Sequence, residues 1–303
     1  GAVHTRFNHC LGTAYLASKV AENICPEATI IITLSALLHD IGHGPFSHAF
    51  EDIYDSKYKI NHEDWTDKFI ENLVADLKVI ESELKAARDI LKSPDNKYHN
   101  IISSQLDVDR FDYLLRDSHF CGVSYGVFDA DWLISCLKIY DHKLAILPKG
   151  LKTLEHYLMA RRTMNHNVYL HKKSCAGSYI FKHFSKIIKN NINIIPESLN
   201  HINFIKFMRL LDTAQQETLN QNTFNEKAIN QLYDTYKSLN ENEIWHLMHL
   251  LTNKEMSIEN ELLFVALRDA ALCMLHRDLP KIYQLRQGVY DSVTEKINEQ
   301  MSG

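Results

Sequence analysis

Glycine, proline and long apolar runs are scarce in this sequence. The chain of 303 residues holds 10 glycines and 6 prolines, whereas Leu, Ile, Lys, Glu and Asn are plentiful. Few helix breakers and many helix formers favour a mainly α-helical fold. No stretch reaches the roughly 18 uninterrupted apolar residues of a transmembrane helix, and no basic segment followed by an apolar run opens the chain. The sequence therefore predicts neither a membrane span nor a signal peptide.

Clustered cysteines and a strong excess of charge are also missing. The six cysteines are scattered without a CxxC motif, which favours reduced thiols and a cytoplasmic location. A net charge of −5 argues against a general nucleic-acid binder, which normally shows a basic face. The same charge leaves room for a small anionic ligand held by a few local Arg and Lys residues.

Hydrophobic periodicity predicts helices over most of the chain. The expected elements are helices over 7–23, 27–41, 61–91 and 103–118, a small hairpin over 137–150, and further helices from 151 onward. The expected apolar stripe of the first helix is formed by Leu11, Tyr15, Leu16 and Val20. We expect a core over residues 1–185 and a C-terminal helical lobe, packed on that core, over residues 186–303.

Local signals set the expected starts of the helices. Pro26 stands where a first-turn proline belongs. Asn61, three residues before Asp64, resembles a capping box and opens the long third helix. Ser103 or Ser104 is the expected N-cap of the fourth helix.

The segment ALLHDIGHGPFSHAFE, residues 36–51, brings ionisable side chains to the end of an apolar helix. His39, Asp40, His43 and His48 fall within ten positions. His39 and His43 share a helix face, whereas Asp40 and His39 reach one point only at the helix end. Two interpretations stay open: a cluster that binds metal or moves protons, and a helix C-terminus whose histidines only compensate the helix dipole.

A second polar pattern lies in SSQLDVDRFDYLLRDSHF. Asp109, Tyr113 and Asp117 follow one another at intervals of four and form a polar line along one helical face. That line indicates a lined cleft, and its alternative is a solvated acidic face that is salt-bridged to neighbouring arginines. His9, in HTRFNHCLG, is by itself only weak support for a ligand.

Taken together, these segments resemble the HD-domain metal phosphohydrolases, in particular their dGTPase-like branch of deoxynucleoside triphosphate (dNTP) triphosphohydrolases. The resemblance rests on HTRFNHCLGTAYLA, ALLHDIGHGPFSHAFE, NHEDW and LDVDRFDYLLRDS, and it covers roughly residues 1–185. It implies a mainly α fold: an HD-domain helical bundle with a small β-hairpin and a C-terminal helical lobe. It also implies hydrolysis of dNTPs to deoxynucleoside and triphosphate.

The resemblance implies one divalent metal ion with His9, His39, Asp40 and Asp109 as its ligands. Two imidazoles and two carboxylates suit Fe, Mn, Ni, Zn or Mg, and ligand type alone does not choose among these metals. Such an ion lowers the pKa of a coordinated water, which can then act as the nucleophile. The resemblance also allows a second Mg²⁺ that accompanies the substrate phosphates.

The remaining site residues are matched to the family by position. The expected proton donor is His48, oriented by Glu51, which stands where the family has a shorter aspartate. Tyr113 would close the space of a 2′-hydroxyl, and Asp117 would accept from the 3′-hydroxyl. Further expected active-site residues are His43 and His62, the phosphate contacts Arg6, Arg110 and Arg161, and Tyr169 beside the sugar and base. The alternatives are a first-turn polar residue for His62 and a basic, aromatic helix face for Arg161 and Tyr169.

Some features leave the substrate open. The family segment before HTRF, with a glutamine that helps to hold sugar and base, is not in this sequence, so we expect the chain to lack its N-terminal part. The alternatives are another nucleotide (a monophosphate, a cyclic dinucleotide or an alarmone) and a nucleotide-responsive binding module. We also expect a homo-oligomer, in which the apolar helical faces of the C-terminal lobe serve as core or interface: Phe204, Phe207, Leu210 and Leu211.

Overall fold

The computed structural model describes residues 2–54, 60–141, 143–217, 224–253, 256 and 258–281. Its helices are α1 (Arg6–Ile24), α2 (Thr29–Leu38), α3 (His48–Glu51), α4 (His62–Asp76), α5 (Glu81–Lys92), α6 (His99–Ile102), α7 (Val108–Cys121), α8 (Ala130–Ser135), α9 (Leu151–Met164), α10 (Lys172–Asn190), α11 (Asn203–Glu217), α12 (Glu226–Tyr236), α13 (Glu241–Thr252) and α14 (Glu261–His276). Two strands, β1 (Leu137–Tyr140) and β2 (Lys143–Ile146), pair antiparallel. The prediction of a mainly α fold with a small hairpin is confirmed.

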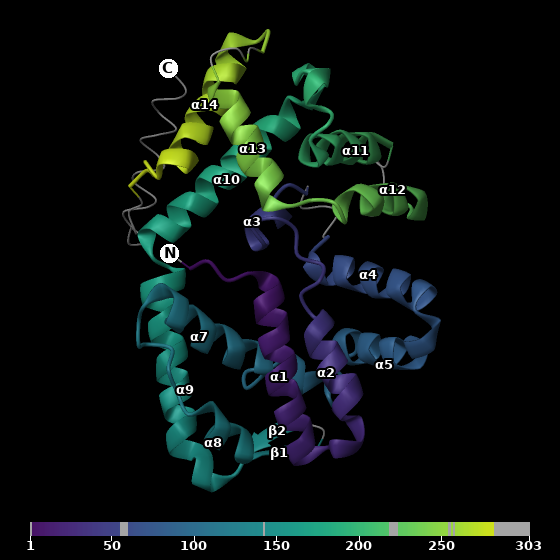
Figure 1. Ribbon diagram of the computed structural model, residues 1–303, viewed down its shortest axis with the longest axis vertical. Helices are drawn as coiled ribbons and strands as arrows, with labels where there is room; N and C mark the ends of the chain where they lie inside the picture. The colour runs from purple at the N-terminus through teal and green to yellow at the C-terminus, as the bar shows by residue number, and fades with distance from the viewer. Residues whose placement is uncertain are drawn as a thin grey trace, which may run out of the picture.

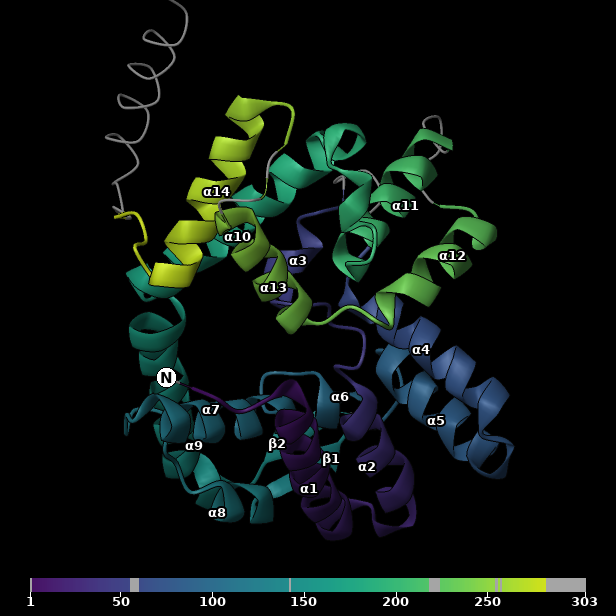
Figure 2. The same cartoon turned by 45° about the horizontal axis from the view of Figure 1, so that its top comes forward.

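The elements form two halves. In Figure 1 the lower half holds α1, α2, α7, α8, α9 and the hairpin, and the upper half holds α10 to α14. The chain passes between the halves through α9 and α10, and α4 and α5 lie beside α2. Figure 2, tilted from this view, shows the N-terminal segment running between the halves. None of the helices within the described ranges combines the length and apolar character that crossing a membrane requires.

Each half has its own apolar core. The lower core gathers buried residues of α1, α2 and α6 to α9, among them Val20, Phe111 and Tyr157. The upper core gathers residues of α10 to α14, but it also includes Phe50 from α3 and Trp65 from α4. The segment that follows the HD pair is therefore anchored in the upper half. The expected division at residue 185 remains a prediction.

Several expected helix starts are present. Thr5 and Asn8 form a capping box at the start of α1, and Asn61 and Asp64 form the predicted one at α4. Pro26 begins a short 3₁₀ turn that leads into α2. By contrast, Ser103 and Ser104 are not the N-cap of α7. That role belongs to Asp107, whose carboxylate accepts the backbone N–H of Arg110 at 2.8 Å.

The single long helix expected over residues 61–91 is wrong. The chain forms α4 and α5, separated by a 3₁₀ turn over Lys78–Ile80. A straight helix over that span would be about 45 Å long. Folding back instead lets Ile70 of α4 and Leu84 of α5 share a small core with Leu38 of α2. No glycine or proline marks the break, so the sequence signal for a helix runs through it.

The structure settles the environment of two expected apolar faces: the α1 stripe is buried at Leu16 and Val20 but not along its whole length, and the α11 face is core. Leu11 and Tyr15 of the predicted α1 stripe are 47% and 60% exposed, because α1 packs its small residues Ala17 and Ala21 against its neighbours. In α11, Phe204 and Phe207 are fully buried in the upper core, together with Leu211. That face is core and not interface. The part of the predicted C-terminal lobe over residues 282–303 lies outside the described residues.

Candidate functional site

The four predicted metal ligands come from three separate helical segments and meet between them. His9 lies on α1, His39 and Asp40 follow the last turn of α2, and Asp109 lies on α7. The Nε2 atoms of His9 and His39 lie 3.1 and 3.6 Å from Asp109 Oδ1. The carboxylate of Asp40 lies 3.7 Å from His9 Nε2 and 3.4 Å from His39 Nε2. The donor atoms of His9, His39 and Asp109 all fall within 4.8 Å of one another.

Outer hydrogen bonds orient both imidazoles toward these carboxylates. His9 Nδ1 pairs with the buried carboxylate of Asp112 at 2.7 Å, and His39 Nδ1 donates to the carbonyl of Ala36 at 2.7 Å. His39 Nε2 is buried and has no hydrogen-bond partner. An imidazole held at one nitrogen and presented at the other is the usual arrangement of a metal-ligating histidine. The residues present therefore fit a divalent ion.

The electrostatics of this group are dominated by close opposite charges in a buried setting. Burial alone would lower the pKa of His9, but hydrogen bonds to Asp109 and Asp112 outweigh it and raise the pKa to about 9. Burial would raise the pKa of Asp109 and Asp40. The nearby His39 and His9 hold the pKa of Asp109 below its usual range, and His39 and Arg6 do the same for Asp40. Both carboxylates are therefore ionised at neutral pH, as metal ligation requires.

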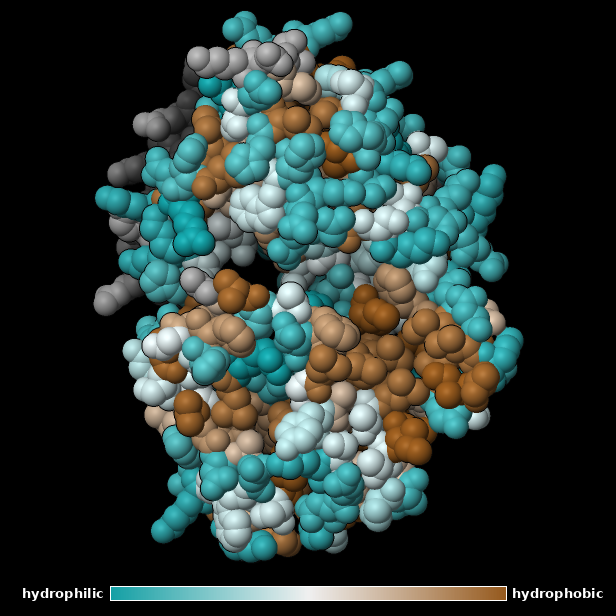
Figure 3. Space-filling model, in the orientation of Figure 1, coloured by the Kyte–Doolittle hydropathy of each residue, from teal (hydrophilic) through white to brown (hydrophobic). Residues whose placement is uncertain are grey.

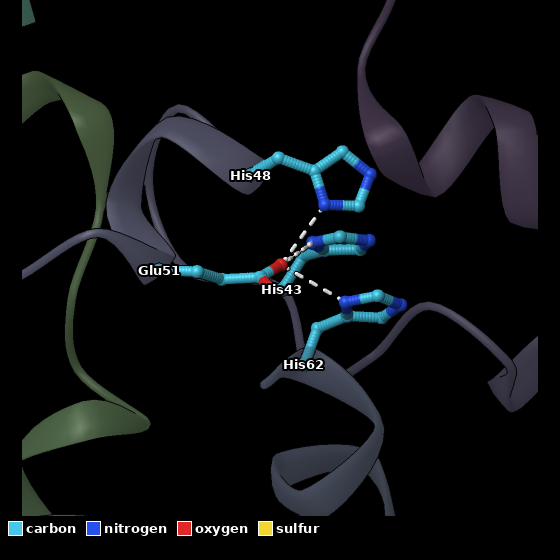
Figure 4. Close-up of side chains that lie close together, drawn as sticks. All are labelled: His43, His48, Glu51 and His62. Carbon is cyan, nitrogen blue, oxygen red and sulfur yellow. Dashed lines mark hydrogen bonds and ion pairs between the residues drawn. The ribbon is translucent and has the colours of Figure 1, made fainter. Parts of the chain in front are cut away.

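A second group of histidines surrounds Glu51, as Figure 4 shows. His48 Nδ1 and His62 Nδ1 lie 3.0 and 2.9 Å from Glu51 Oε1, and His43 Nδ1 lies 3.8 Å from it. All four donor atoms fall within 4.8 Å of one another. Burial, followed by the charge of Arg6, lowers the pKa of His43 to about 3, so this imidazole is neutral.

The backbone that leads into this group is strained. Phe46 and Ser47 have φ angles of 59° and 54°, in the left-handed region that residues with a Cβ rarely adopt. Tertiary contacts hold them there, because Phe46 N donates to Glu241 at 3.2 Å and the Phe46 ring packs on Phe181 at 4.2 Å. Strained residues of this kind are typical of functional sites. Here they turn the chain so that His48 starts α3 beside the HD pair.

A large cleft joins the two groups. Its volume is about 1080 Å³, and Figure 3 shows the surface hollowed between the two halves of the molecule. The expected site residues that line it are Arg6, His9, Asp40, His43, His48, His62, Asp109, Tyr113, Asp117 and Tyr169. Arg6 forms an ion pair with Asp40 and donates to the hydroxyl of Ser47. The volume slightly exceeds the range of about 300–1,000 Å³ that is typical of small-molecule sites.

Tyr113, Asp117 and Tyr169 form one wall of the cleft. The Tyr169 hydroxyl donates to Asp117 Oδ2 at 2.8 Å, and the rings of Tyr113 and Tyr169 meet edge-on at 5.8 Å. The other oxygen of Asp117 pairs with His4 Nε2 at 2.9 Å. Burial and the charge of Asp117 raise the pKa of Tyr169, so its hydroxyl stays protonated and acts as a donor.

Two predicted phosphate contacts do not line the large cleft. Arg110 forms an ion pair with the fully buried Asp107, and it lines a smaller cavity of about 350 Å³ together with His39, Asp40 and Asp109. Arg161 donates to the side chain of Gln105 at 2.7 Å. Neither arginine is among the described residues that line the large cleft, whereas Arg116, which was not predicted, is.

Sequence reasoning missed residues that act behind the site. Asp112 holds His9 and accepts two hydrogen bonds from Arg116, both at 2.8 Å. The third carboxylate in DVDRFD was the only signal for it. Thr66 and Tyr236 fix the turn after the HD pair: Thr66 Oγ1 accepts from Gly42 N at 3.0 Å, and the Tyr236 hydroxyl donates to Gly42 O at 2.7 Å. No local pattern indicates either contact.

Comparison with known proteins agrees with this geometry. The sequence model of the HD domain family matches residues 6–117, and that of the HD-associated region family matches residues 128–262. A fold of helices around a His/Asp centre of this kind defines an HD-domain protein of the phosphohydrolase type. The chain belongs to that family, and it carries the HD-associated region directly after the HD domain.

Relatives and solved structures extend the likeness. An uncharacterized protein of Methanocaldococcus jannaschii is 33% identical over 86% of this chain and 56% of its own length. A deoxynucleoside triphosphate triphosphohydrolase SAMHD1 homolog of Dictyostelium discoideum is 31% identical over 56% of this chain and 38% of its own. A crystal structure of a phosphohydrolase from Bacteroides thetaiotaomicron superposes with a TM-score of 0.73 at 27% identity, covering 99% of this chain and 72% of that one. The chain spans about half the length of the curated relatives that it matches.

Proposed function

We propose that this chain is a metal-dependent phosphohydrolase that cleaves dNTPs into deoxynucleoside and triphosphate. The observation that carries the proposal is that one cleft is lined by His9, Asp40 and Asp109 together with His48, whose ring is hydrogen-bonded to Glu51. A site that only bound nucleotides would have no need of a positioned proton donor. Membership of the HD phosphohydrolases and the likeness to a dNTP triphosphohydrolase support the same reaction class.

His9, His39, Asp40 and Asp109 would hold the metal, which supplies Lewis acidity and lowers the pKa of the attacking water. Arg6, at the rim of that group, would neutralise phosphate charge, and Arg116 lines the same cleft. Arg110 and Arg161 do not line this cleft, but Arg110 lines the smaller cavity that shares Asp40 and Asp109 with it, so phosphate binding by Arg110 stays part of the proposal.

His48 would protonate the leaving 5′-oxygen. Its Nδ1 is held by Glu51 at 3.0 Å, so Nε2 is the atom available to the substrate. An alkoxide is a poor leaving group, and an imidazole paired with a carboxylate donates a proton near neutral pH.

At the opposite wall, Tyr113 would pack against the sugar where a 2′-hydroxyl would sit. Asp117 would accept from the 3′-hydroxyl, because each of its oxygens keeps a second lone pair.

The decisive experiment follows the fate of water oxygen. The chain is loaded with Mn²⁺ and incubated in ¹⁸O-water with each dNTP, and separately with ribonucleotides, a deoxynucleoside monophosphate, a cyclic dinucleotide and an alarmone. We expect turnover of dNTPs with the label in tripolyphosphate and none in the nucleoside. Label in the nucleoside would mean C–O cleavage, and orthophosphate or pyrophosphate as first product would mean that the phosphate tail lies the other way round. Turnover of only one of the other nucleotides would replace the proposed substrate.

We further propose a cytoplasmic homo-oligomer. All six cysteines are free, which suits a reducing compartment. Exposed apolar side chains lie on α1, where Phe7 is 67% exposed beside Leu11 and Tyr15, and at the turn between α4 and α5, where Val79 is 96% exposed. Figure 3 shows apolar atoms gathered over α2 and this turn. Light scattering at micromolar concentration tests the assembly, and a monomer there would contradict it.

A further inference from the structure

The histidines around Glu51 converge through the same ring atom. His43 comes from the turn after the HD pair, His48 and Glu51 from α3, and His62 from the first turn of α4. All three Nδ1 atoms face the Glu51 carboxylate, and in Figure 4 all three Nε2 atoms point away from it. Three donors from separate segments thus surround one carboxylate oxygen.

Hydrogen bonding accounts for only two of the three histidines. Glu51 Oε1 pairs with His48 and His62 at 3.0 and 2.9 Å. His43 Nδ1 lies 3.8 Å away, is buried and has no hydrogen-bond partner, and the side chain is only 3% exposed. The ring is held in this position by stacking on His62, with the centroids 3.9 Å apart and the planes 9° from parallel. A buried polar atom without a partner costs about 1–3 kcal/mol, so its orientation toward the carboxylate points to a ligand at that place.

A divalent cation of the zinc type satisfies all four atoms. Zinc binds His nitrogen and carboxylate oxygen at about 2.0–2.2 Å in tetrahedral geometry, which sets neighbouring ligands about 3.4 Å apart. The three nitrogens lie 2.9, 3.0 and 3.8 Å from Glu51 Oε1. Each of these separations lies within about half an ångström of the tetrahedral value. The His43 and His62 rings, which are nearly parallel, must also tilt toward each other so that both Nδ1 lone pairs meet at the ion. Three neutral imidazoles with one carboxylate also form a donor set that favours Zn over Mg or Ca.

We propose that His43, His48, His62 and Glu51 form a second divalent-metal site, separate from the His9–His39–Asp40–Asp109 group. The two groups share no residue. Zinc in the second site engages Nδ1 of His48 and removes Glu51 as its partner, so the ring no longer carries the extra proton that it would donate. Excess zinc therefore inhibits the hydrolase; this consequence, unlike the binding itself, rests on the proposed function.

Metal stoichiometry tests the site without any substrate. The full chain, freed of metal by chelator, is dialysed against buffered Zn²⁺, and bound zinc is counted by mass spectrometry. We expect two equivalents in wild type and one in Glu51→Gln and in His48→Asn. His48 is 75% exposed, so its replacement leaves the fold intact. Asp109→Asn should also bind one equivalent, and its combination with Glu51→Gln none. The control His156→Ala, at an exposed position on α9, should keep two.

Cobalt identifies which site is filled. Co²⁺ in a four-coordinate site absorbs visible light. The absorption of cobalt bound in the second site should be present in wild type and Asp109→Asn but absent in Glu51→Gln and His48→Asn. One equivalent in wild type would overturn the proposal. Two equivalents in both Glu51→Gln and His48→Asn would also overturn it, because the second ion would then be bound elsewhere.

Inhibition is measured separately on the active chain. Addition of zinc to protein that already holds one equivalent should lower kcat at least tenfold with little change in KM, with a midpoint equal to that of second-site binding. Occupancy of the second site without loss of kcat would refute the inhibitory role. No dNTP turnover at one equivalent would instead refute the proposed function and leave the stoichiometry result standing.

Discussion

Gly42 is a position where a single methyl group should damage the site. It lies in the turn between the HD pair and the histidines that follow, against the first turn of α4. A Cβ on Gly42 would lie 2.6 Å from Thr66 Oγ1 and closer still to Thr66 N and His62 O, whereas ordinary contact begins at 3.4 Å. Backbone atoms cannot rotate away, so α4 or the turn must move by about 1 Å.

The Gly42→Ala change should therefore affect both stability and catalysis. Forcing an extra methyl into a packed site costs about 1–3 kcal/mol. A displacement of about 1 Å at His62 and the adjoining histidines should lower kcat/KM for dNTP hydrolysis about 100-fold. Thermal unfolding and steady-state kinetics measure these two consequences, and metal analysis checks the expectation that follows. The ligands His9 and Asp109 lie on other helices, so metal at the HD group should be retained.

A matched glycine provides the control. Gly177 lies within α10, and the nearest atom to a Cβ built there is 3.9 Å away. Gly177→Ala should leave kcat/KM unchanged and should raise stability by up to about 1 kcal/mol, because alanine is the better helix former. If Gly42→Ala matched Gly177→Ala in both melting temperature and rate, the close packing of the turn on α4 would be refuted as the reason for a glycine there.

The remaining predictions concern single side chains. His39→Ala and Asp109→Ala should each lose the metal and lower the melting temperature together, since a ligand that binds only the native state stabilises it; unchanged metal content in both would disprove the ligand assignment. His48→Ala should keep the HD metal and the fold but lose about 10²–10⁴-fold in kcat, and full activity would remove its proposed role. Asp67→Asn should lower the free energy of unfolding at pH 7 by only about 1 kcal/mol, because solvent screens the ion pair with Arg88 and Lys92. Arg88 and then Lys92 hold the pKa of Asp67 at about 2, below its ordinary 3.8. The difference in free energy of unfolding between wild type and Asp67→Asn, measured by urea denaturation, should therefore be present near neutral pH and vanish as pH falls toward 2. A difference that persists at pH 2 would contradict the ion-pair explanation.

The densest part of the site was predictable because its residues are local in sequence. HDIGHGPFSHAFE holds two of the expected metal ligands and three of the four residues in the Glu51 group. His9 and Asp109 carry no local signal that would join them to this segment, and only the resemblance to a family suggested that they meet it. The extent of α1 was predictable from its periodicity, and the start of α4 was predictable from the Asn61–Asp64 capping pattern, although its end was not.

Tertiary packing accounts for what a pattern along the sequence could not predict. Residues 61–91 are helical in propensity throughout, and the fold breaks them because Ile70 and Leu84 bury more surface when α4 and α5 lie side by side. Arg110 follows Asp109 directly and was expected to face the phosphates. Its guanidinium pairs with Asp107, whose carboxylate is completely buried and needs a cationic partner, and its contact with a phosphate stays a prediction. Neither outcome can be deduced from a pattern along one helix.

The upper half is part of the site and not an appendage to it. The turn that carries His43 is hydrogen-bonded to α12, because the Tyr236 hydroxyl donates to the carbonyl of Gly42. The turn before His48 is hydrogen-bonded to α13, because Phe46 N donates to the Glu241 carboxylate. Phe50, between His48 and Glu51, is 1% exposed and packs against α11 aromatics in the upper core. A piece that ended near residue 185 would expose Phe50 and release both turns. The HD ligands could still meet in it, but the histidines around Glu51 would lose the supports that aim them at one carboxylate, so proton donation should fail before metal binding does.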